Sequence, residues 1–266
     1  MQGVSVPRTL LIAAHPDDET IGAAIRISRT PGIGIVHVTE GSPVNPADAV
    51  RAGFSTRKAY AEARREEAFR ALALAGIPRD AVTNLYFIDQ KVAFELESLT
   101  LRLLVLFEQF RPQIVLTHAY EGGHPDHDSV AFACHSAKTL HELERPESGF
   151  QLLEFTSYHA DAGGIAAYEF LPIPNWKEFP HLLTPSEREL KIAMLREFTS
   201  QQKTLEAFMQ PEVEPFRPAP RYDFRRAPHL GRLFYEYFDW GIDGATWRDF
   251  AHDAERHLLR AIGRAA

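Results

Sequence analysis

Two kinds of hydrophobic pattern alternate along the first half of the chain. Short, almost continuous apolar runs predict buried strands over residues 9–14, 33–39, 84–88 and 114–118. Between these runs, apolar residues recur every three or four positions, which predicts helices over residues 18–29, 55–75 and 95–110. Gly76 and Pro78 form a stop signal just after the second of these helices.

This alternation predicts the fold. Strands separated by helices of this length form right-handed βαβ units and a parallel sheet. We therefore predict an α/β chain with a Rossmann-like, doubly wound, mostly parallel sheet and helices on both faces, built from roughly the first 145 residues. Ligands of such sheets bind in the crevice beyond the carboxyl ends of the strands.

The second half of the chain is less regular. We predict strands over residues 151–158 and 168–173, and a closing helix over residues 247–262. Residues 234–240 alternate as in a strand. We expect their aromatic side chains to pack in the core, and part of the run could stack on a ligand.

A further helix should begin at Thr184, because Thr184 and Glu187 have the spacing of a capping box, and it should run to about Phe208. Prolines and aromatic residues over 211–228 predict an extended segment. We predict one domain over residues 1–266, in which the irregular C-terminal segment, residues 211–266, packs on the core and can shape the substrate pocket.

Composition and charge narrow the class of protein. Of 266 residues, 45% are hydrophobic and 24% are charged, as in ordinary soluble domains. The formal net charge of −7 argues against a nucleic-acid partner, and the run Arg64-Arg65-Glu66-Glu67 is interpreted as a solvated helix face. No segment approaches the ~20 apolar residues of a membrane helix. The N-terminal apolar run is too short for a signal peptide, so we expect a cytoplasmic protein.

The single cysteine, Cys134, excludes an intramolecular disulfide and a thiolate-rich zinc site. We expect Cys134 to be a buried small hydrophobic residue. Any metal ligands must therefore be histidines and carboxylates.

Two polar clusters follow the first and fourth predicted strands, and so lie at the same edge of the sheet. They are His15-Pro16-Asp17-Asp18-Glu19 and His124-Pro125-Asp126-His127. A catalytic zinc ion takes three nitrogen or oxygen ligands and keeps one position open for water. His15, Asp18 and His127 satisfy that count with suitable donors.

The other polar residues of the clusters then have natural roles. Asp17 can accept a proton from a metal-activated water. His124 can either protonate the leaving amine or stabilise the developing oxyanion. Asp126 can orient an imidazole, and Gly122 and Gly123 allow the loop to approach a ligand closely.

Each cluster also has a simpler explanation. An acidic helix N-cap accounts for the first, and a polar turn accounts for the second. The occurrence of both clusters at matching strand ends favours the metal site over these two explanations.

With these motifs the chain resembles the LmbE-like or PIG-L-like N-acetylglucosaminyl deacetylases, over roughly the first 205 residues. Support beyond the two clusters comes from Thr39-Glu40-Gly41, Arg65-Glu66-Glu67, Arg111-Pro112 with the strand at 114–118, and Lys191 followed by Ser200-Gln201.

The resemblance implies a zinc-dependent enzyme that removes an acetyl group from the 2-amino group of an amino sugar. It implies that His15, Asp18 and His127 hold the metal, that Asp17 is the general base, and that His124, supported by Asp126, is the acid or oxyanion group. Some members carry an aromatic residue in the loop before the second motif, where Tyr120 stands in this chain.

We expect a small-molecule N-acetylated substrate and no membrane partner, and a homo-oligomer is compatible with the sequence. Glu40 after the second strand and His159 at a later strand end are further candidate substrate contacts, beside Tyr120. The motifs do not select zinc over other divalent metals.

Three other functions stay open. A metal-dependent amidase could act on a non-sugar acylated metabolite or on a thiol–sugar conjugate. A non-catalytic Rossmann-like binding module is disfavoured, because acidic residues replace the Gly-x-Gly-x-x-Gly turn after the first strand. A structural metal site would have four protein ligands and no open position.

Overall fold

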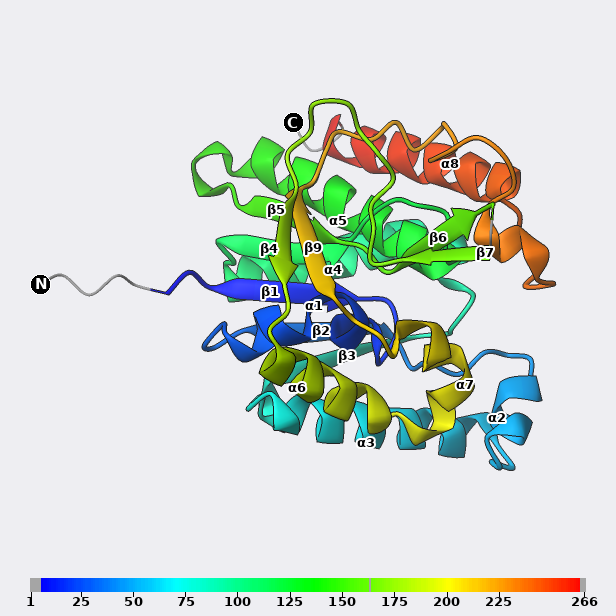
Figure 1. Ribbon diagram of the computed structural model, residues 1–266. Helices are drawn as coiled ribbons and strands as arrows, with labels where there is room; N and C mark the ends of the chain where they lie inside the picture. The colour runs from blue at the N-terminus through cyan, green and yellow to red at the C-terminus, as the bar shows by residue number, and fades with distance from the viewer. Residues whose placement is uncertain (1–5, 163, 264–266) are drawn as a thin grey trace, which may run out of the picture.

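The computed structural model describes residues 6–162 and 164–263 (Figure 1), and it describes side chains as far as residue 260. Seven strands form one sheet in the order β3-β2-β1-β4-β5-β9-β8. Five of them are parallel: β1 (Thr9–Ala13), β2 (Gly34–Thr39), β3 (Val82–Phe87), β4 (Ile114–His118) and β5 (Gln151–Phe155). At one edge β9 (Val213–Pro218) and β8 (Phe179–Leu182) continue the sheet in antiparallel pairs.

Helices cover both faces of the sheet, so the predicted α/β fold with a mostly parallel sheet is confirmed (Figure 1). On one face lie α1 (Asp18–Ser28), α3 (Arg57–Leu74), α6 (Pro185–Arg196) and α7 (Gln202–Leu205). On the other lie α4 (Leu96–Phe110), α5 (Pro125–Glu144) and α8 (Gly244–Gly263). A short helix, α2 (Ala47–Arg51), follows β2 and has no counterpart in the sequence prediction.

The strands are apolar on both faces because both faces are covered. Along β1, Leu10 and Ile12 pack in a cluster with Phe107 of α4, whereas Leu11 packs with Ile27 of α1 on the opposite face. A strand buried in this way has a continuous apolar run instead of an alternating pattern. This explains why the first four strands were recognisable in the sequence.

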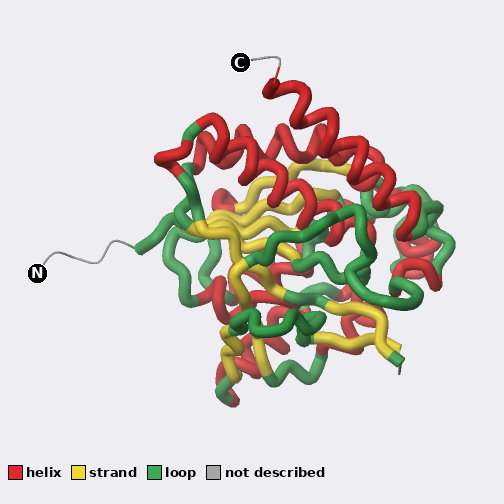
Figure 2. The backbone as a smooth tube through the Cα atoms, turned by 90° about the horizontal axis from the view of Figure 1, so that it is seen from above, coloured by secondary structure: helices red, strands yellow, loops and turns green. Residues whose placement is uncertain are grey.

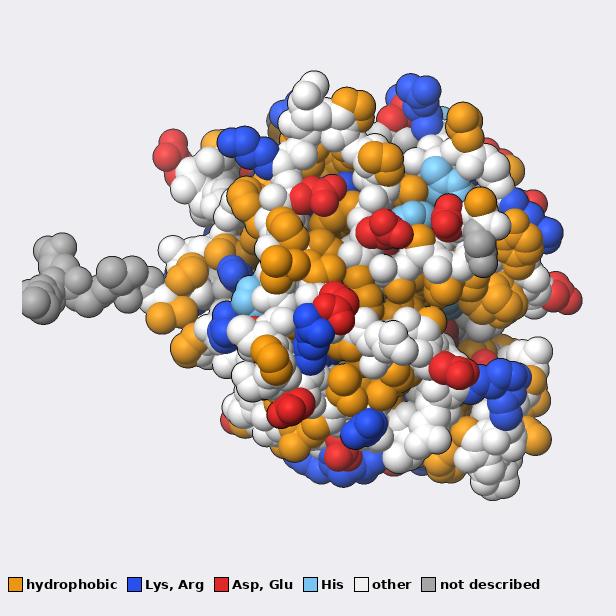
Figure 3. All heavy atoms as spheres, viewed as in Figure 1, with side chains coloured by type: hydrophobic (Ala, Val, Ile, Leu, Met, Phe, Trp, Pro, Cys, Tyr) orange, Lys and Arg blue, Asp and Glu red, His pale blue; other side chains and the backbone are white. Residues whose placement is uncertain are grey.

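A two-stranded hairpin lies beyond the carboxyl ends of the parallel strands in both Figure 1 and Figure 2. It consists of β6 (Tyr158–Asp161) and β7 (Gly164–Ala167). The single strand predicted over residues 151–158 is therefore divided between β5 and β6. On the molecular face drawn in Figure 3, basic and acidic side chains are interspersed among apolar ones.

Two other predictions for this half of the chain were wrong. Residues 168–173 form no strand, and residues 234–240 contain a 3-10 helix, Phe234–Tyr237, in place of a strand. That turn is stabilised by the Glu236 carboxylate, which accepts hydrogen bonds from the backbone N–H groups of Leu233 and Gly244.

The helix predicted from Thr184 to about Phe208 begins as expected, with its capping box, but α6 ends at Arg196. Beyond it, the buried Glu67 carboxylate of α3 accepts hydrogen bonds from the hydroxyl of Thr199 and from the backbone N–H and hydroxyl of Ser200. Such side-chain bonds compete with helical ones, and the chain continues to Phe208 as two 3-10 turns with the four-residue helix α7 between them.

The C-terminal segment packs on the core through α8. Trp247 is fully buried and its indole N–H donates a hydrogen bond to the Ser129 hydroxyl of α5, at 3.0 Å. No helix among the described residues is long and apolar enough to span a bilayer.

Helix α1 is interrupted at Ala23, whose φ of −149° and ψ of 23° are not helical. The interruption frees backbone groups inside the protein, and two residues from the second half of the chain satisfy them. The Glu214 carboxylate accepts hydrogen bonds from the N–H groups of Ile25 and Arg26, at 3.0 and 3.2 Å. The Lys191 ammonium donates to the Ile21 carbonyl at 2.6 Å and to Glu214 at 2.9 Å.

We predict that Lys191→Met lowers the free energy of unfolding by about 3–5 kcal/mol, because it leaves the Glu214 carboxylate buried without a cation. Urea denaturation followed by circular dichroism measures the change. Arg51→Met, which removes an exposed ion pair with Asp48, is the matched control and should cost less than about 1 kcal/mol. Equal effects of the two substitutions would contradict this account.

Candidate metal centre

The two polar clusters of the sequence meet in space. Strands β1 and β4 are parallel neighbours, with Leu10 opposite Val115, so the turns that follow them lie side by side. The His15 ring centroid is 4.5 Å from that of His124 and 5.2 Å from that of His127. All three imidazoles are buried.

The Asp18 carboxylate lies between two of these imidazoles. One oxygen, Oδ2, is 3.1 Å from His15 Nδ1, and the other, Oδ1, is 3.1 Å from His127 Nε2. Ligand atoms at about 2.1 Å from a tetrahedral ion stand roughly 3.4 Å apart, so each of these two separations fits two ligands of one ion. Among the described residues, three groups have one possible ligand atom from every member within 4.8 Å of the others: His15 with His124 and His127, His15 with Asp89, His124 and Asp126, and Asp18 with His118 and His127. The single set of His15, Asp18 and His127 stays a prediction.

Two carboxylates orient His15 from its other side. Its Nε2 is 3.1 Å from Asp89 Oδ1 and 3.3 Å from Asp126 Oδ2. The Asp126 carboxylate is itself held by the backbone N–H groups of Gln90 and Val92. A carboxylate on the far nitrogen of a ligating histidine is a common arrangement, because it fixes the ring and its tautomer.

Asp126 thus supports a different imidazole from the one expected. The resemblance implied support for His124, but the Asp126 carboxylate contacts His15. Only the backbone N–H of Asp126 reaches His124, donating to Nδ1 at 3.1 Å. The reason is local: His124 is the N-cap of α5, and its side chain accepts a backbone hydrogen bond of the first turn.

That cap also defines the protonation of His124. Since Nδ1 accepts a hydrogen bond, the proton of the neutral ring resides on Nε2. Burial, followed by the nearby His15 and His127, lowers the pKa of His124 well below its usual value, which agrees with a neutral ring. His124 therefore offers one N–H donor at Nε2.

His118, at the end of β4, is excluded as a ligand through Nε2, because that atom accepts the backbone N–H of Ala14 at 3.0 Å. Burial and the neighbouring His127 lower the pKa of His118 to about 4. The ring stacks on His127 with centroids 4.1 Å apart. His118 is therefore a packed histidine behind the site.

Asp17 occupies a strained position between two predicted ligands. Its φ of 152° is rare for a residue other than glycine, and such strain clusters at functional sites. The Arg64 guanidinium donates to Asp17 Oδ2 at 2.7 Å and to the Gly41 carbonyl at 2.6 Å. Burial raises the pKa of Asp17 to about 7, against the opposing effect of Arg64.

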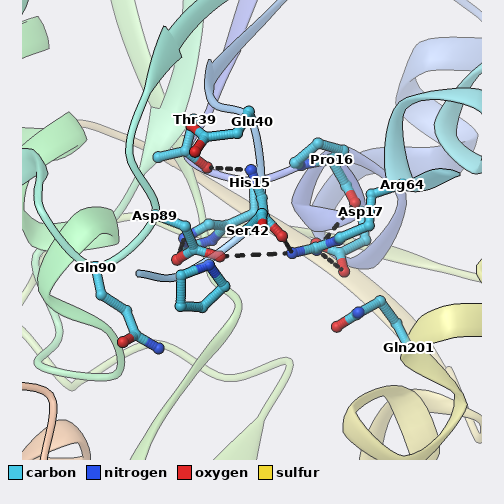
Figure 4. Close-up of polar contacts among 12 residues, drawn as sticks. His15, Pro16, Asp17, Thr39, Glu40, Ser42, Arg64, Asp89, Gln90 and Gln201 are labelled. Carbon is cyan, nitrogen blue, oxygen red and sulfur yellow. Dashed lines mark hydrogen bonds and ion pairs between the residues drawn. The ribbon is translucent and has the colours of Figure 1, made fainter. Parts of the chain in front are cut away.

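Arg64 and Asp89 are site residues that the sequence analysis missed. Figure 4 shows the Arg64 guanidinium between the Asp17 and Asp89 carboxylates, and the distance to Asp89 is 3.6 Å. The interpretation of Arg64–Glu67 as a solvated face was wrong, since Arg64 and Glu67 are only 5% and 3% exposed. Asp89 follows strand β3, so the rule for strand ends could have identified it.

The loop before the second motif passes directly under β6. A Cβ atom at Gly123 would lie 2.0 Å from the Tyr158 carbonyl oxygen, so only glycine fits. The buried Glu121 carboxylate joins the two segments by accepting hydrogen bonds from Thr156, Ser157 and Tyr158. Burial raises the pKa of Glu121 to about 8.

The structure contradicts Tyr120 as a substrate contact. Its hydroxyl donates to the Arg226 carbonyl at 2.9 Å, and its ring packs against Tyr222, Phe224 and Trp247. Tyr120 thus belongs to a buried hydrophobic cluster with residues of α5 and aromatic residues of the C-terminal segment.

The other two predicted substrate contacts, Glu40 and His159, make contacts with other side chains of the protein. Glu40 follows β2 and pairs with Arg57. His159 lies in β6, is 8% exposed, and places Nδ1 3.9 Å from a Glu121 carboxylate oxygen. Cys134 is buried in the core cluster, as expected.

Aromatic rings from two other segments pack against the imidazoles of His124 and His127. From the hairpin, Tyr158 packs on His127 at 5.4 Å, and from the C-terminal segment, Trp240 packs on His124 at 4.6 Å. Phe234 and Phe238 connect these two, with Phe234 against Tyr158 and Phe238 stacked on Trp240. The C-terminal segment therefore borders the site.

Comparison with known families gives one match. Residues 10–138 match the model of the family described as PIG-L, GlcNAc-PI de-N-acetylase. No curated protein matches the sequence at a significant level.

Three solved structures illustrate the shared fold. The A40926 pseudoaglycone deacetylase Dbv21 superposes with a TM-score of 0.61 and 19% identity, covering 82% of this chain and 99% of its own. The N,N'-diacetylchitobiose deacetylase from Pyrococcus horikoshii superposes with a TM-score of 0.59 and 17% identity. The match covers 80% of this chain and 84% of that deacetylase. A 4-carboxy-2-hydroxymuconate hydratase from Pseudomonas putida superposes with a TM-score of 0.52 and 18% identity. The match covers 81% of this chain and 98% of the hydratase. Because a hydratase shares the fold, the fold alone does not define the reaction.

We predict that Arg64→Met destabilises the protein by about 3–5 kcal/mol, since it leaves Asp17 buried without its cation. Arg65→Met is the matched control. Arg65 is the next residue of α3 and pairs with the exposed Glu62, so its loss should cost less than about 1 kcal/mol. Thermal and urea unfolding of both variants measures the difference, and a stable Arg64→Met protein would show that the guanidinium is not needed to bury Asp17.

Proposed function

Residues 10–138 match the model of the PIG-L family, and from this premise we propose that the chain is a zinc-dependent hydrolase. It removes an N-acetyl group from an amino sugar or from a small molecule that contains one. The observation that carries the proposal is the Asp18 carboxylate, which lies 3.1 Å from both His15 Nδ1 and His127 Nε2.

The donor set supports zinc. Two imidazoles and one carboxylate are the ligands of many catalytic zinc sites, which keep a fourth position for water or substrate. In the proposed enzyme His15 ligates through Nδ1, Asp18 through its carboxylate and His127 through Nε2. When bound, the ion would polarise the amide carbonyl and lower the pKa of a water molecule.

Asp17 is the proposed general base. Arg64 holds Oδ2, which leaves Oδ1 to accept a proton from the attacking water. A divalent cation beside Asp17 favours its ionised form, as a base requires. Arg64 and the strained backbone of Asp17 hold this carboxylate in place between the two ligands of the first motif.

His124 is the proposed oxyanion donor. Its Nδ1 accepts a hydrogen bond from the Asp126 backbone, so a neutral ring can donate from Nε2 to the oxygen on which charge develops. Protonation of the leaving amine by His124 would require both nitrogens to carry protons, which would break that bond. Asp126 and Asp89 position His15.

The family description and the names of two deacetylases with a similar fold support this substrate class. The proposal rests on the donor set and on Asp17, since a hydratase has a similar fold. We propose that Glu40 and His159 contact the substrate, and that the C-terminal segment, as part of a single domain, shapes the pocket through Trp240. The net charge of −7 argues against a nucleic-acid partner, and we propose a cytoplasmic enzyme with a free small-molecule substrate.

We predict that the purified protein releases acetate from one or more members of a panel of N-acetylated sugars and their glycosides. Dialysis against a chelator should reduce the rate more than about 100-fold, because the ion supplies several kcal/mol of transition-state stabilisation. Adding back zinc at one equivalent should restore it. The panel should include N-acylated compounds without a sugar, since activity on these alone would favour an amidase of another kind.

We predict that Asp17→Asn lowers kcat by roughly 10³-fold, as expected for loss of a general base, and leaves the zinc content near one per chain. His127→Ala should lose both activity and metal, because it removes a ligand. Acetate assays and elemental analysis of the same preparations separate the two effects. An Asp17→Asn variant that retains full activity would rule out the proposed base.

A further inference from the structure

A cavity of about 410 Å³ is lined by none of the residues of the proposed active site. Its lining comes from the last turns of α1, from the residues that lead into β1, and from β4, β5, β8 and β9. Helix α1 begins at Asp18 beside the metal motifs, and the cavity lies at the other end of this helix. Sites for small molecules have volumes of about 300–1,000 Å³, so the cavity is large enough for such a ligand.

The floor of the cavity is an apolar part of the sheet. Leu116 pairs with Leu153, and Phe179 pairs with Phe216. Paired residues of neighbouring strands point to the same face, and all four of these side chains line the cavity. Leu116 and Phe216 are buried in the cluster beneath α1, whereas Phe179 is 56% exposed. The apolar floor therefore continues beyond the end of α1 to the protein surface, as is typical of a binding site.

The rim of the cavity carries an accessible positive charge. Arg26, in the last turn of α1, lines the cavity, is exposed to solvent, and forms no ion pair with any carboxylate of the described residues. Arg29 also lines the cavity but pairs with Glu187. The buried Glu214 carboxylate is compensated by the Lys191 ammonium and by backbone N–H groups. Arg26 is therefore the arginine of this lining that is free to bind an anion.

The edge strand β8 is a poor site for pairing with another polypeptide chain. Pro180 of β8 stands opposite Pro215 of β9, and neither residue has a backbone N–H group. The two cannot form a hydrogen-bonded pair, so the nitrogen of Pro180 faces the outer edge of the sheet, where a further strand needs a donor. Proline on an edge strand protects it against such pairing. The apolar floor beside β8 is accordingly better suited to a small molecule.

We propose that this cavity binds an aliphatic carboxylate, a small amphiphile with one negative charge. Its hydrocarbon chain lies on Phe179 and Phe216, and its carboxylate pairs with the guanidinium of Arg26. Arginine suits this role because its planar guanidinium can donate two parallel hydrogen bonds to one carboxylate. The site is independent of the proposed hydrolase reaction, since no proposed metal ligand or catalytic residue lines it.

Calorimetric titration of the whole chain with octanoate, 1-octanol and acetate tests this assignment. Octanoate should bind wild type more tightly than 1-octanol, which lacks the charge, and more tightly than acetate, which lacks the chain. Arg26→Gln should weaken octanoate binding about tenfold and leave the affinity for 1-octanol unchanged. Arg188→Gln is the matched control, because Arg188 lies on α6 outside the lining and pairs with the exposed Glu212. It should bind octanoate as wild type does.

A second pair of variants tests the apolar floor. Phe179→Ser should weaken the binding of octanoate and of 1-octanol about tenfold each, whereas Leu182→Ser should change neither. Leu182 is the matched control because it lies on the same strand, is 75% exposed and is outside the lining. The proposal is overturned if octanoate does not bind wild type, if Arg26→Gln binds octanoate as wild type does, or if the two β8 variants have equal affinities. Octanoate bound only at the metal centre would give the last two results.

Discussion

The burial of several carboxylates beside one another is the constraint on which this structure depends. Asp17, Asp18, Asp89 and Asp126 are all at most 5% exposed at one edge of the sheet. Each buried charge costs several kcal/mol unless a cation or several hydrogen bonds compensate it. Arg64 and backbone N–H groups compensate part of this charge, and Asp89 and Asp18 raise the pKa of His15 well above its usual value despite its burial. The same concentration of negative charge makes the pocket suited to a divalent cation.

Sequence patterns were sufficient for the parts of this arrangement that depend on topology. Continuous apolar runs predict buried parallel strands, and the turns after adjacent strands must meet. The approach of His15 to His127, from two motifs about 110 residues apart, could therefore be predicted from the sequence. The sequence also predicted that the Asp126 carboxylate orients an imidazole. It did not predict that this imidazole is His15 and not His124. That choice depends on the N-cap of α5 and on the Gln90 and Val92 amides, which only the folded chain brings together.

For the residues whose role was predicted wrongly, the sequence pattern is compatible with both a buried and an exposed position. A charged run such as Arg64–Glu67 looks solvated, and only the tertiary structure shows that α3 turns Arg64 and Glu67 inward. Tyr120 stands at the expected place in its loop, yet the aromatic residues of the C-terminal segment bury it. Those residues lie outside the family match over 10–138, and no period of two or 3.6 describes the turns that they form.

The interruption of α1 links the beginning of the chain to its end. This helix begins at Asp18, and its second half depends on the Lys191 ammonium and the Glu214 carboxylate for hydrogen bonds that no earlier residue supplies. During synthesis on the ribosome, the first βα unit therefore emerges long before its helix can be completed. The backbone groups freed at Ala23 reach these two partners only after β9 has left the exit tunnel.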